Sequence, residues 1–205
     1  MMTKEKQQVS VSPDGEEFPI PEKSEYRDEF VRIKSLADTA RLEGKEIVVV
    51  VGVGFVGAVM AAIVADTVDS KTKKPSKFVI GMQRPSTRSF WKIGLLNRGI
   101  SPVKAEDPEV DPMIRRCVLD KKTLVATFTE EALKLADVVV VDVQCDYIKE
   151  SLGDCKTGRA DMAALEKSLY TIAENIPPAA LVLIETTVAP GTTEQVANPI
   201  IKKVF

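Results

Sequence analysis

An α/β fold built on a doubly wound parallel sheet is predicted by three observations on this sequence. Apolar, β-branched runs of strand length alternate with helical segments, the first run ends in the glycines Gly52-x-Gly54-x-x-Gly57, and an apolar helix follows them. Alternating strands and helices form parallel sheets with right-handed crossovers. The glycine spacing behind a strand is that of Rossmann-like sheets, so the predicted fold is Rossmann-like.

The first part of the chain precedes this pattern. Residues 1–23 are polar and are interrupted by prolines and a glycine, and we expect them to form a disordered N-terminal segment because they bury too little apolar surface. Residues 24–44 predict an amphipathic helix that begins at Ser24 and ends at Gly44. Its apolar positions recur at helical spacing: Phe30, Ile33, Leu36, Ala37 and Ala40.

Residues 45–205 predict the dinucleotide-binding domain. The first strand begins at Glu46, and the helix from Phe55 to about Val68 is apolar almost all round, as expected for a helix packed against a sheet. Thr129 is expected to cap a short helix, and Asp161 to open a later one. Further strands are expected at 77–81, 123–128, 137–143 and 181–185.

The glycine motif predicts a pyrophosphate site. Gly52 permits a tight turn out of the strand, Gly54 lets the backbone approach the phosphates, and Gly57 lets helix and strand pack closely. The phosphates would lie at the N-terminus of the helix, where free N–H groups and the helix dipole stabilise negative charge without a basic side chain. A plain turn between a strand and a helix needs no such spacing, which argues against a structural role alone.

The residues after the second strand bear on the choice of cofactor. Dinucleotide sites usually carry an acid there that hydrogen-bonds the adenosine ribose, whereas this chain has Gln83. An amide can still bond a hydroxyl, but it lacks the charge that repels a 2′-phosphate, and Arg84 or Arg88 could attract one. We expect NAD, and the sequence leaves NADP open. Solvated loop arginines would explain Arg84 and Arg88 equally well.

The segments after the fourth and fifth strands complete the predicted cofactor site with Val143, Cys145 and Thr187. The doubled threonine at 186–187 places hydroxyls at the carboxyl edge of the sheet, which favours a functional role. Thr192 is expected to cap the next helix in a capping box with Gln195. Cys145 is not predicted to be a nucleophile, because no activating base accompanies it.

Composition excludes several kinds of chemistry. Histidine is absent, which removes the commonest general base and metal ligand and excludes serine–histidine and cysteine–histidine catalysis within this chain. No metal site is predicted. The three cysteines, Cys117, Cys145 and Cys155, lack the paired spacing of a disulfide framework or a zinc cluster, so free thiols are expected.

Charge and length narrow the partners. A chain of 205 residues predicts one domain with appendages, and a net charge of −2 provides no long-range attraction to nucleic acid. The uncharged stretch 47–65 carries glycines at dinucleotide spacing, and we interpret it as strand, turn and helix rather than a membrane span. The N-terminus lacks the apolar core of a secretory signal. We therefore expect a cytoplasmic protein that binds neither nucleic acid nor membrane.

Three blocks together resemble the UDP-glucose/GDP-mannose dehydrogenase family, the nucleotide-sugar dehydrogenases. They are VVVVGVGFVGAVMA, LLNRGISPVKAED and LVLIETTVAPGTTEQV, supported by the strand ADVVVVDVQCD. Phe55 and Val56 match the aromatic residue and valine that often follow the family's glycines. Thr187 matches the threonine near the nicotinamide and the reacting carbon. Glu185 before Pro-Gly-Thr-Thr favours the members that act on UDP-N-acetylhexosamines.

The resemblance implies NAD-dependent oxidation of the C6 hydroxyl of a UDP-sugar to the uronic acid, with Thr187 as the catalytic residue of this chain. The family's catalytic cysteine, lysine and asparagine belong to segments beyond Phe205, so the 205 residues are expected to bind cofactor and turn over little. A homo-oligomer is expected for the full-length protein. Gln83 and the pair Cys145-Asp146, where Thr-Pro is usual, depart from the family pattern.

Two other functions stay open at this point. A hydroxyacid or 6-phosphogluconate type dehydrogenase would share the glycine motif but lack the ETTVAPGTT block. A non-catalytic dinucleotide-binding module would be consistent with Gln83 and with the absent substrate domain. Because Rossmann-like sheets host many functions, the fold alone does not decide among the three.

Overall fold

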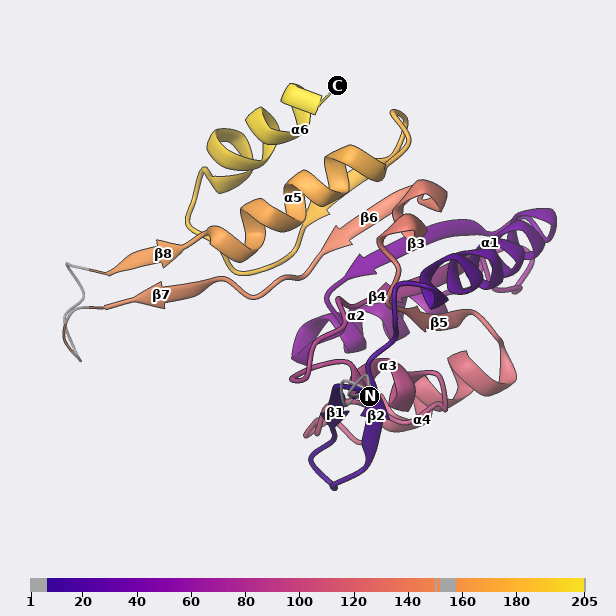
Figure 1. Ribbon diagram of the computed structural model, residues 1–205. Helices are drawn as coiled ribbons and strands as arrows, with labels where there is room; N and C mark the ends of the chain where they lie inside the picture. Colours follow the sequence, from indigo (N-terminus) through magenta and orange to yellow (C-terminus); the bar gives the residue numbers. More distant parts are fainter. Residues whose placement is uncertain (1–6, 150, 152–157, 205) are drawn as a thin grey trace.

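A five-stranded parallel sheet with helices on both faces forms the centre of the computed structural model, which describes residues 7–149, 151 and 158–204 (Figure 1). The strands are β1 (Val9–Val11), β2 (Glu17–Pro19), β3 (Glu46–Val51), β4 (Lys77–Met82), β5 (Leu124–Thr127), β6 (Val138–Val141), β7 (Asp146–Ile148), β8 (Arg159–Asp161) and β9 (Leu181–Ile184). The α-helices are α1 (Glu25–Leu42), α2 (Phe55–Asp66), α3 (Trp91–Leu96), α4 (Val110–Arg115), α5 (Ala163–Asn175) and α6 (Asn198–Val204). Shorter helical segments are the π-helices η1 (Arg116–Asp120) and η3 (Thr193–Ala197) and the 3-10 helix η2 (Glu130–Leu135).

The central sheet has the order β5-β4-β3-β6-β9, and every neighbouring pair is parallel. The middle strand β3 reads EIVVVV and is buried from Ile47 to Val51. Uninterrupted β-branched runs suit a parallel strand that is covered on both faces, because side chains of either parity then meet apolar neighbours. The predicted α/β fold with a doubly wound parallel sheet is therefore confirmed.

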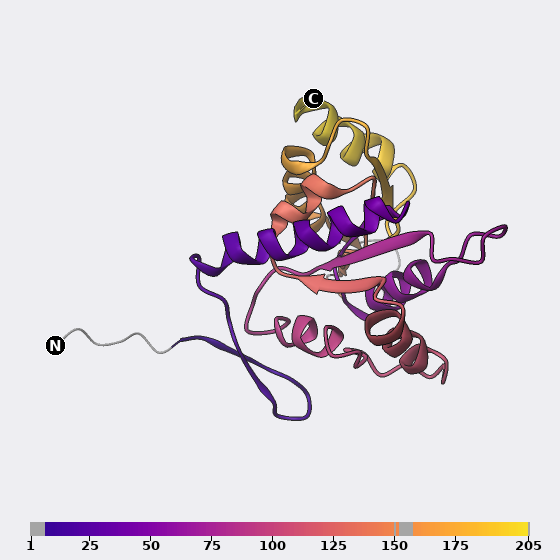
Figure 2. The same cartoon turned by 90° about the vertical axis from the view of Figure 1, so that its right-hand side faces the viewer.

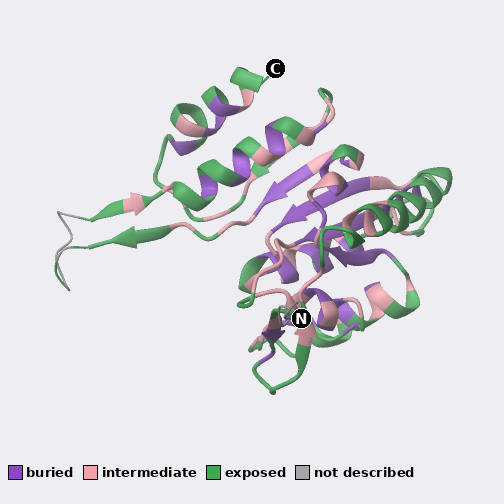
Figure 3. Cartoon of the chain, in the orientation of Figure 1, coloured by how far each residue is buried: buried purple, intermediate pink, exposed green. Residues whose placement is uncertain are grey.

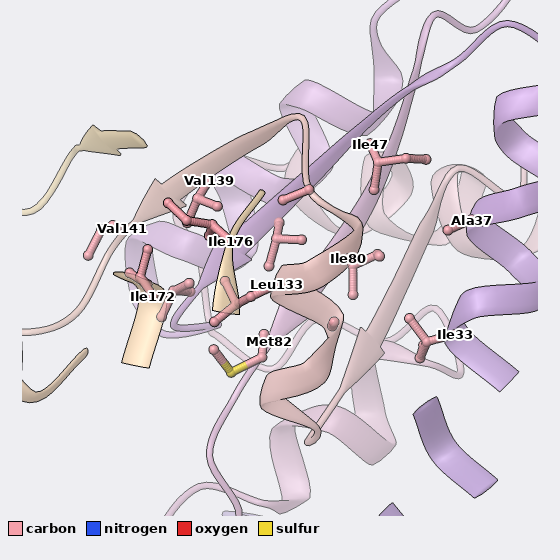
Figure 4. Close-up of a cluster of buried hydrophobic side chains, with 14 of the residues drawn as sticks. Ile33, Ala37, Ile47, Ile80, Met82, Leu133, Val139, Val141, Ile172 and Ile176 are labelled. Carbon is pink, nitrogen blue, oxygen red and sulfur yellow. The ribbon is translucent and has the colours of Figure 1, made fainter. Parts of the chain in front are cut away.

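Two hydrophobic clusters lie on opposite faces of this sheet. Figure 4 shows the first, in which Ile33 of α1, Leu133 of η2 and Ile172 of α5 pack over side chains of β3, β4 and β6. The second cluster joins Ala61 of α2, Leu96 of α3 and the neighbouring helix α4 to the other face. Helices therefore cover both faces of the sheet.

The chain reverses its direction of winding between β3 and β6. From β3 the chain passes through α2 to β4 on one side, whereas β6 and β9 follow on the other side of β3. At such a switch point the loops that leave adjacent strands diverge and open a crevice at the carboxyl ends of the strands. The arrowheads of β3 and β6 mark this position in Figure 1.

The N-terminal segment is a correction to the prediction. Residues 1–6 lie outside the described part of the chain, but β1 and β2 form an antiparallel hairpin, so the prediction of disorder over 1–23 is wrong for this stretch (Figure 2). Ser10 is fully buried, and the ring of Phe18 lies against Gly94 of α3. A bidentate ion pair joins Arg98 to Glu16. Long-range contacts order this hairpin, and local composition does not reveal them.

The expected amphipathic helix over 24–44 corresponds to α1, whose Ile33, Ala37 and Ala40 are buried on the sheet. Figure 2 shows α1 lying across the sheet, with the hairpin hanging from its N-terminal end. Ser24 precedes this helix without a side-chain hydrogen bond to it. The start of α1 is held instead by the Glu25 carboxylate, which accepts from the Glu22 N–H at 2.7 Å, and by Tyr26, whose ring packs on Phe128.

Of the two threonine caps predicted for the shorter helices, one is confirmed and one is wrong. Thr129 caps η2, a 3-10 helix, by accepting a hydrogen bond from the Glu131 N–H at 3.4 Å. The capping box predicted for Thr192 and Gln195 is absent, because the Thr192 hydroxyl donates to the Ala189 carbonyl at 2.7 Å. The turn before the helix thus uses the hydroxyl that would otherwise cap it.

An antiparallel arm, β7 with β8, projects from the body between β6 and α5 (Figure 3). Its strands are largely exposed, and Asp161 at the end of β8 accepts a hydrogen bond from the Ala163 N–H of α5 at 3.1 Å. Cys155 lies outside the described residues. Cys117 is buried and Cys145 is partly exposed, and both are free thiols.

Candidate cofactor site

The glycine loop is a cradle that side chains would close. Gly52 has a φ of +99°, and a Cβ built on it would lie 2.5 Å from the Asp142 carbonyl oxygen. A Cβ on Gly57 would lie 1.8 Å from the Gly52 carbonyl oxygen. Gly54, in contrast, has no heavy atom within 4 Å of the corresponding position. The loop is therefore closed against the protein at Gly52 and Gly57 and open to a ligand at Gly54, as a pyrophosphate site requires.

The N-terminus of α2 supplies the electrostatics of this cradle. The helix has 12 residues, from Phe55 to Asp66, and begins directly after Gly54. Its first N–H groups and its dipole point toward the open side of the loop and favour negative charge there. Phe55 and Val56 are 68% and 54% exposed at the mouth of the site. The loop therefore fits a dinucleotide phosphate without a basic side chain from α2.

A cleft of about 560 Å³ extends from this loop along the carboxyl edge of the sheet. Its walls come from the ends of β3, β4 and β6, from the segment after β9, and from α5. The structure brings every residue of the predicted site into the lining of this one cleft: Gly52, Gly54, Phe55, Val56, Gly57, Gln83, Arg84, Arg88, Val143, Cys145 and Thr187. Their contacts with a cofactor remain predictions.

Gln83, which follows β4, is engaged on both ends of its amide. Its Oε1 accepts a hydrogen bond from the Val53 N–H of the glycine loop at 3.1 Å, and its Nε2 donates to the Ser89 hydroxyl at 3.3 Å. The side chain therefore joins the glycine loop to the loop that leaves β4. It carries no charge into the cleft.

The two arginines of this loop differ in their partners. Arg84 is held by Glu130 at 3.0 Å and donates to the Thr171 hydroxyl of α5 at 3.0 Å. Arg88 is exposed, and within the described chain its side chain has no carboxylate within 4.0 Å. The interpretation of both arginines as freely solvated is therefore wrong for Arg84, whose ion pair spans two elements.

Asp142, at the end of β6, lies beneath the glycine loop. Its Oδ2 is buried and has no hydrogen-bond partner among the described residues, and it would lie 2.9 Å from a Cβ on Gly57. Burial raises the pKa of the Asp142 carboxyl, and repulsion from Glu185 raises it further. Burial at this position thus disfavours negative charge below the phosphate site.

The far end of the cleft is formed after β6 and β9. The Cys145 Sγ lies 3.5 Å from the Asp161 carbonyl oxygen and 3.6 Å from the Met162 Sδ, so among the described residues its hydrogen-bond partners do not include an activating base. Thr187 is exposed in the lining, next to Thr186. This end presents hydroxyl and thiol groups beyond two strand ends, where a nicotinamide bound to the cradle would reach.

Several lining residues escaped the sequence-based prediction. They are Ser86, Ser89, Lys92, Asp142, Ser168 and Thr171. Ser168 and Thr171 lie on α5. The sequence predicted this helix from its apolar face alone, which gives no signal for polar residues that line a cleft. Lys92 lies within the first turn of α3, which is six residues long and too short for a clear periodicity. Asp142 was detectable, because a carboxylate that ends an otherwise apolar strand is unusual.

Asn97, in the block LLNRGISPVKAED, supports the sheet and is not part of the cleft lining. The Asn97 side chain donates to the Ala126 carbonyl at 3.0 Å and accepts from the Ala126 N–H at 2.7 Å. Ala126 lies on β5, an edge strand of the sheet. Asn97 thus pairs with the free edge of this strand, as a neighbouring strand would.

No group of three or more histidine, cysteine, aspartate or glutamate residues in the described part of the chain could hold a metal ion. None of the helices over 7–149 and 158–204 is both long and apolar enough to cross a membrane.

Comparisons with known proteins agree with this geometry. The sequence profile of the UDP-glucose/GDP-mannose dehydrogenase family, NAD binding domain, matches residues 46–204. The UDP-N-acetyl-D-mannosamine dehydrogenase of Pyrococcus horikoshii is 32% identical over 103 residues, which cover 50% of this chain and 22% of that protein.

Solved structures give the same result. The NDP-N-acetyl-D-galactosaminuronic acid dehydrogenase of Methanosarcina mazei Go1 aligns with a TM-score of 0.66 and 28% identity, covering 84% of this chain and 33% of that one. The GDP-mannose dehydrogenase of Pseudomonas aeruginosa aligns with a TM-score of 0.59 and 25% identity, covering 77% and 32%. The chain therefore spans about a third of the length of these structures.

Proposed function

The chain belongs to the UDP-glucose/GDP-mannose dehydrogenase family, and from this premise we propose that it is the cofactor-binding part of a nucleotide-sugar 6-dehydrogenase. The cofactor is NAD. The proposed reaction oxidises the C6 hydroxyl of a UDP-sugar to the uronic acid. The observation that carries the proposal is the glycine cradle at the switch point of the sheet, open at Gly54 and continuous with a cleft that reaches Thr187.

The residues of the chain have distinct roles in this proposal. Gly52, Gly54 and Gly57 bring the backbone and the start of α2 against the pyrophosphate, and Gln83 fixes the loop from below. When bound, NAD supplies the hydride acceptor. Thr187, beyond the end of β9, orients the reacting oxygen or a water near the nicotinamide.

A UDP-N-acetylhexosamine is the substrate we favour. The names of two relatives support it, since one is a UDP-N-acetyl-D-mannosamine dehydrogenase and another an NDP-N-acetyl-D-galactosaminuronic acid dehydrogenase. The sequence of this chain supports it through Glu185 before the Pro-Gly-Thr-Thr turn. We further propose that the whole protein is a cytoplasmic homo-oligomer.

The 205 residues alone are proposed to bind NAD without turnover. Cys145 is the one thiol in the cleft lining formed by described residues, and its hydrogen-bond partners there are a backbone carbonyl and a thioether. The second oxidation, from aldehyde to acid, requires a thiolate that holds the sugar carbon as a thiohemiacetal. In this proposal that nucleophile comes from outside this chain.

Calorimetric titration of the chain with NAD tests the proposal, with Gly54→Ala as the decisive variant. A Cβ at Gly54 meets no protein atom within 4 Å, so this variant should fold as the parent does. Because the Cβ would occupy the space where the phosphates approach, we expect NAD affinity to fall about tenfold or more. Gly158→Ala, on the β8 side of the arm, is the matched control and should bind NAD unchanged.

Two results would overturn the proposal. Failure of the folded parent chain to bind NAD would remove the cofactor role. Equal NAD affinity in Gly54→Ala and the parent would show that the nucleotide does not use the cradle. If the whole protein bound NAD but formed no NADH from any UDP-sugar, a non-catalytic dinucleotide-binding module would be the better account.

A further inference from the structure

The adenosine end of the cleft lacks the group that normally selects NAD. In sites of this kind, a carboxylate at the end of the second strand of the domain bonds the ribose and repels a 2′-phosphate. Gln83 occupies that position after β4, and its amide is held between the Val53 N–H and the Ser89 hydroxyl. The side chain is therefore neutral and directed at the loop. A 2′-phosphate would meet no negative charge from it.

The remaining charges at this end are positive. Arg84 is neutralised by Glu130, but Arg88 and Lys92 line the cleft without a carboxylate within 4.0 Å in the described chain. Asp142 is the one acid among the lining residues described, and it lies under the glycine loop rather than beside the loop after β4. Two cations that have no counter-ion among the described residues thus line the cleft on the segment after Gln83, where the adenosine ribose is expected.

Hydroxyl donors accompany these cations. The Ser86 and Ser89 oxygens lie 2.7 Å apart, and Ser89 also accepts from Gln83. Lys92 is half-buried, with its Nζ 5.8 Å from the centre of the Trp91 ring. Burial lowers the pKa of the Lys92 ammonium, and an anion bound beside it would offset that desolvation. Serine hydroxyls beside an arginine and a lysine form a set of donors suited to a phosphate monoester.

We propose that this end of the cleft is a 2′-phosphate site formed by Arg88, Lys92 and Ser86, so that the chain binds NADP at least as tightly as NAD. The proposal rests on the proposed function, because it places the adenosine ribose beside the glycine cradle. The site adds a cofactor form to the NAD that the family profile names.

Titration calorimetry with paired probes tests the site. NAD and NADP differ by one phosphate, as do 5′-AMP and its 2′-phosphate derivative, which report on the adenosine end alone. We expect the phosphorylated member of each pair to bind at least as tightly as its partner. In Arg88→Ala and Lys92→Met, the ratio of NADP to NAD affinity should fall about tenfold, as for the loss of one charge-assisted hydrogen bond.

Lys71→Met is the matched control, because Lys71 is an exposed lysine in the loop before β4, at the opposite end of the strand. It should leave the affinity ratio unchanged. If NAD bound and NADP bound at least tenfold more weakly, the 2′-phosphate site would be refuted while the proposed function stood. If neither bound to the folded chain, the proposed function itself would fail. An unchanged ratio in both cleft variants would refute the assignment to Arg88 and Lys92.

Discussion

At the scale of the residue, the glycine loop buries the Asp142 carboxyl beneath it and so raises the pKa of that carboxyl. Gly57 allows α2 to approach β6 so closely that the Asp142 Oδ2 is shielded from water and has no described partner. The folded state therefore favours the protonated carboxyl, and its pKa is raised mainly by burial. The close packing that forms the phosphate cradle thus also disfavours an ionised carboxylate beneath it.

Asp142→Asn is predicted to stabilise the chain at neutral pH. Because the folded pKa exceeds the unfolded value of about 4, the penalty on the wild type is absent below pH ~4 and grows as the pH rises through the folded pKa. Urea unfolding should give the variant a higher free energy of unfolding than the parent at pH 7, and this difference should disappear in acid. Asp14→Asn, an exposed control in the hairpin turn, should show none. A pH-independent difference would contradict this account.

At the scale of the element, the N-terminal hairpin is tied to the loop that leaves β4. The buried Ser10 hydroxyl donates to the Thr87 carbonyl at 2.9 Å and accepts from the Trp91 N–H at 3.2 Å. This loop carries Ser86 and Arg88 of the proposed 2′-phosphate site. The hairpin, which precedes the part matched by the family profile, thereby holds the loop in position.

Ser10→Ala is predicted to weaken NADP binding as well as stability. The change leaves the Thr87 carbonyl of the loop and the Trp91 N–H of α3 without this partner, which costs about 1–3 kcal/mol of unfolding free energy. Calorimetry should show a lower NADP affinity. Ser12→Ala is the matched control: Ser12 is also buried in the hairpin, but among the described residues its hydroxyl bonds only the Glu16 N–H, at 3.1 Å. Equal NADP affinities in the two variants would show that the hairpin stabilises the fold without positioning the loop.

The same hairpin could not be predicted from the sequence, whereas the central sheet could. The central strands were predictable because β-branched runs such as β3 carry their own signal, and the glycine spacing located the cradle. β1 (VSV) and β2 (EFP) are three residues each, too short for an alternating pattern to stand out, and their order comes from Ser10 and Phe18, which contact α3 and its preceding loop. Similarly, the bond from Val53 to Gln83 depends on β3 lying beside β4, which no local pattern contains.

At the scale of the whole molecule, the two edge strands of the sheet, β5 and β9, differ in whether side chains bond their outer edges. β5 is blocked by Asn97 and by Arg32, whose guanidinium donates to the Ala126 carbonyl at 3.3 Å. β9 pairs with β6 on one side only, and within the described chain no residue bonds its outer edge. Leu181 and Leu183 are 54% and 37% exposed on the face away from α5 and α6. An open edge with exposed leucines favours association with another strand.

We therefore predict that the 205-residue chain self-associates through β9. Sedimentation velocity over a range of concentrations should show reversible association in the parent and a monomer in the double variant Leu181→Lys, Leu183→Lys, because lysines on an edge strand oppose strand pairing. NAD affinity, measured in parallel, reports that the variant remains folded. Leu42→Lys replaces a leucine that is 90% exposed at the end of α1 and should associate as the parent does. If both variants associated as strongly as the parent, the contact would lie elsewhere. If the parent itself stayed monomeric, the predicted self-association through β9 would be wrong, and the fold would be unaffected.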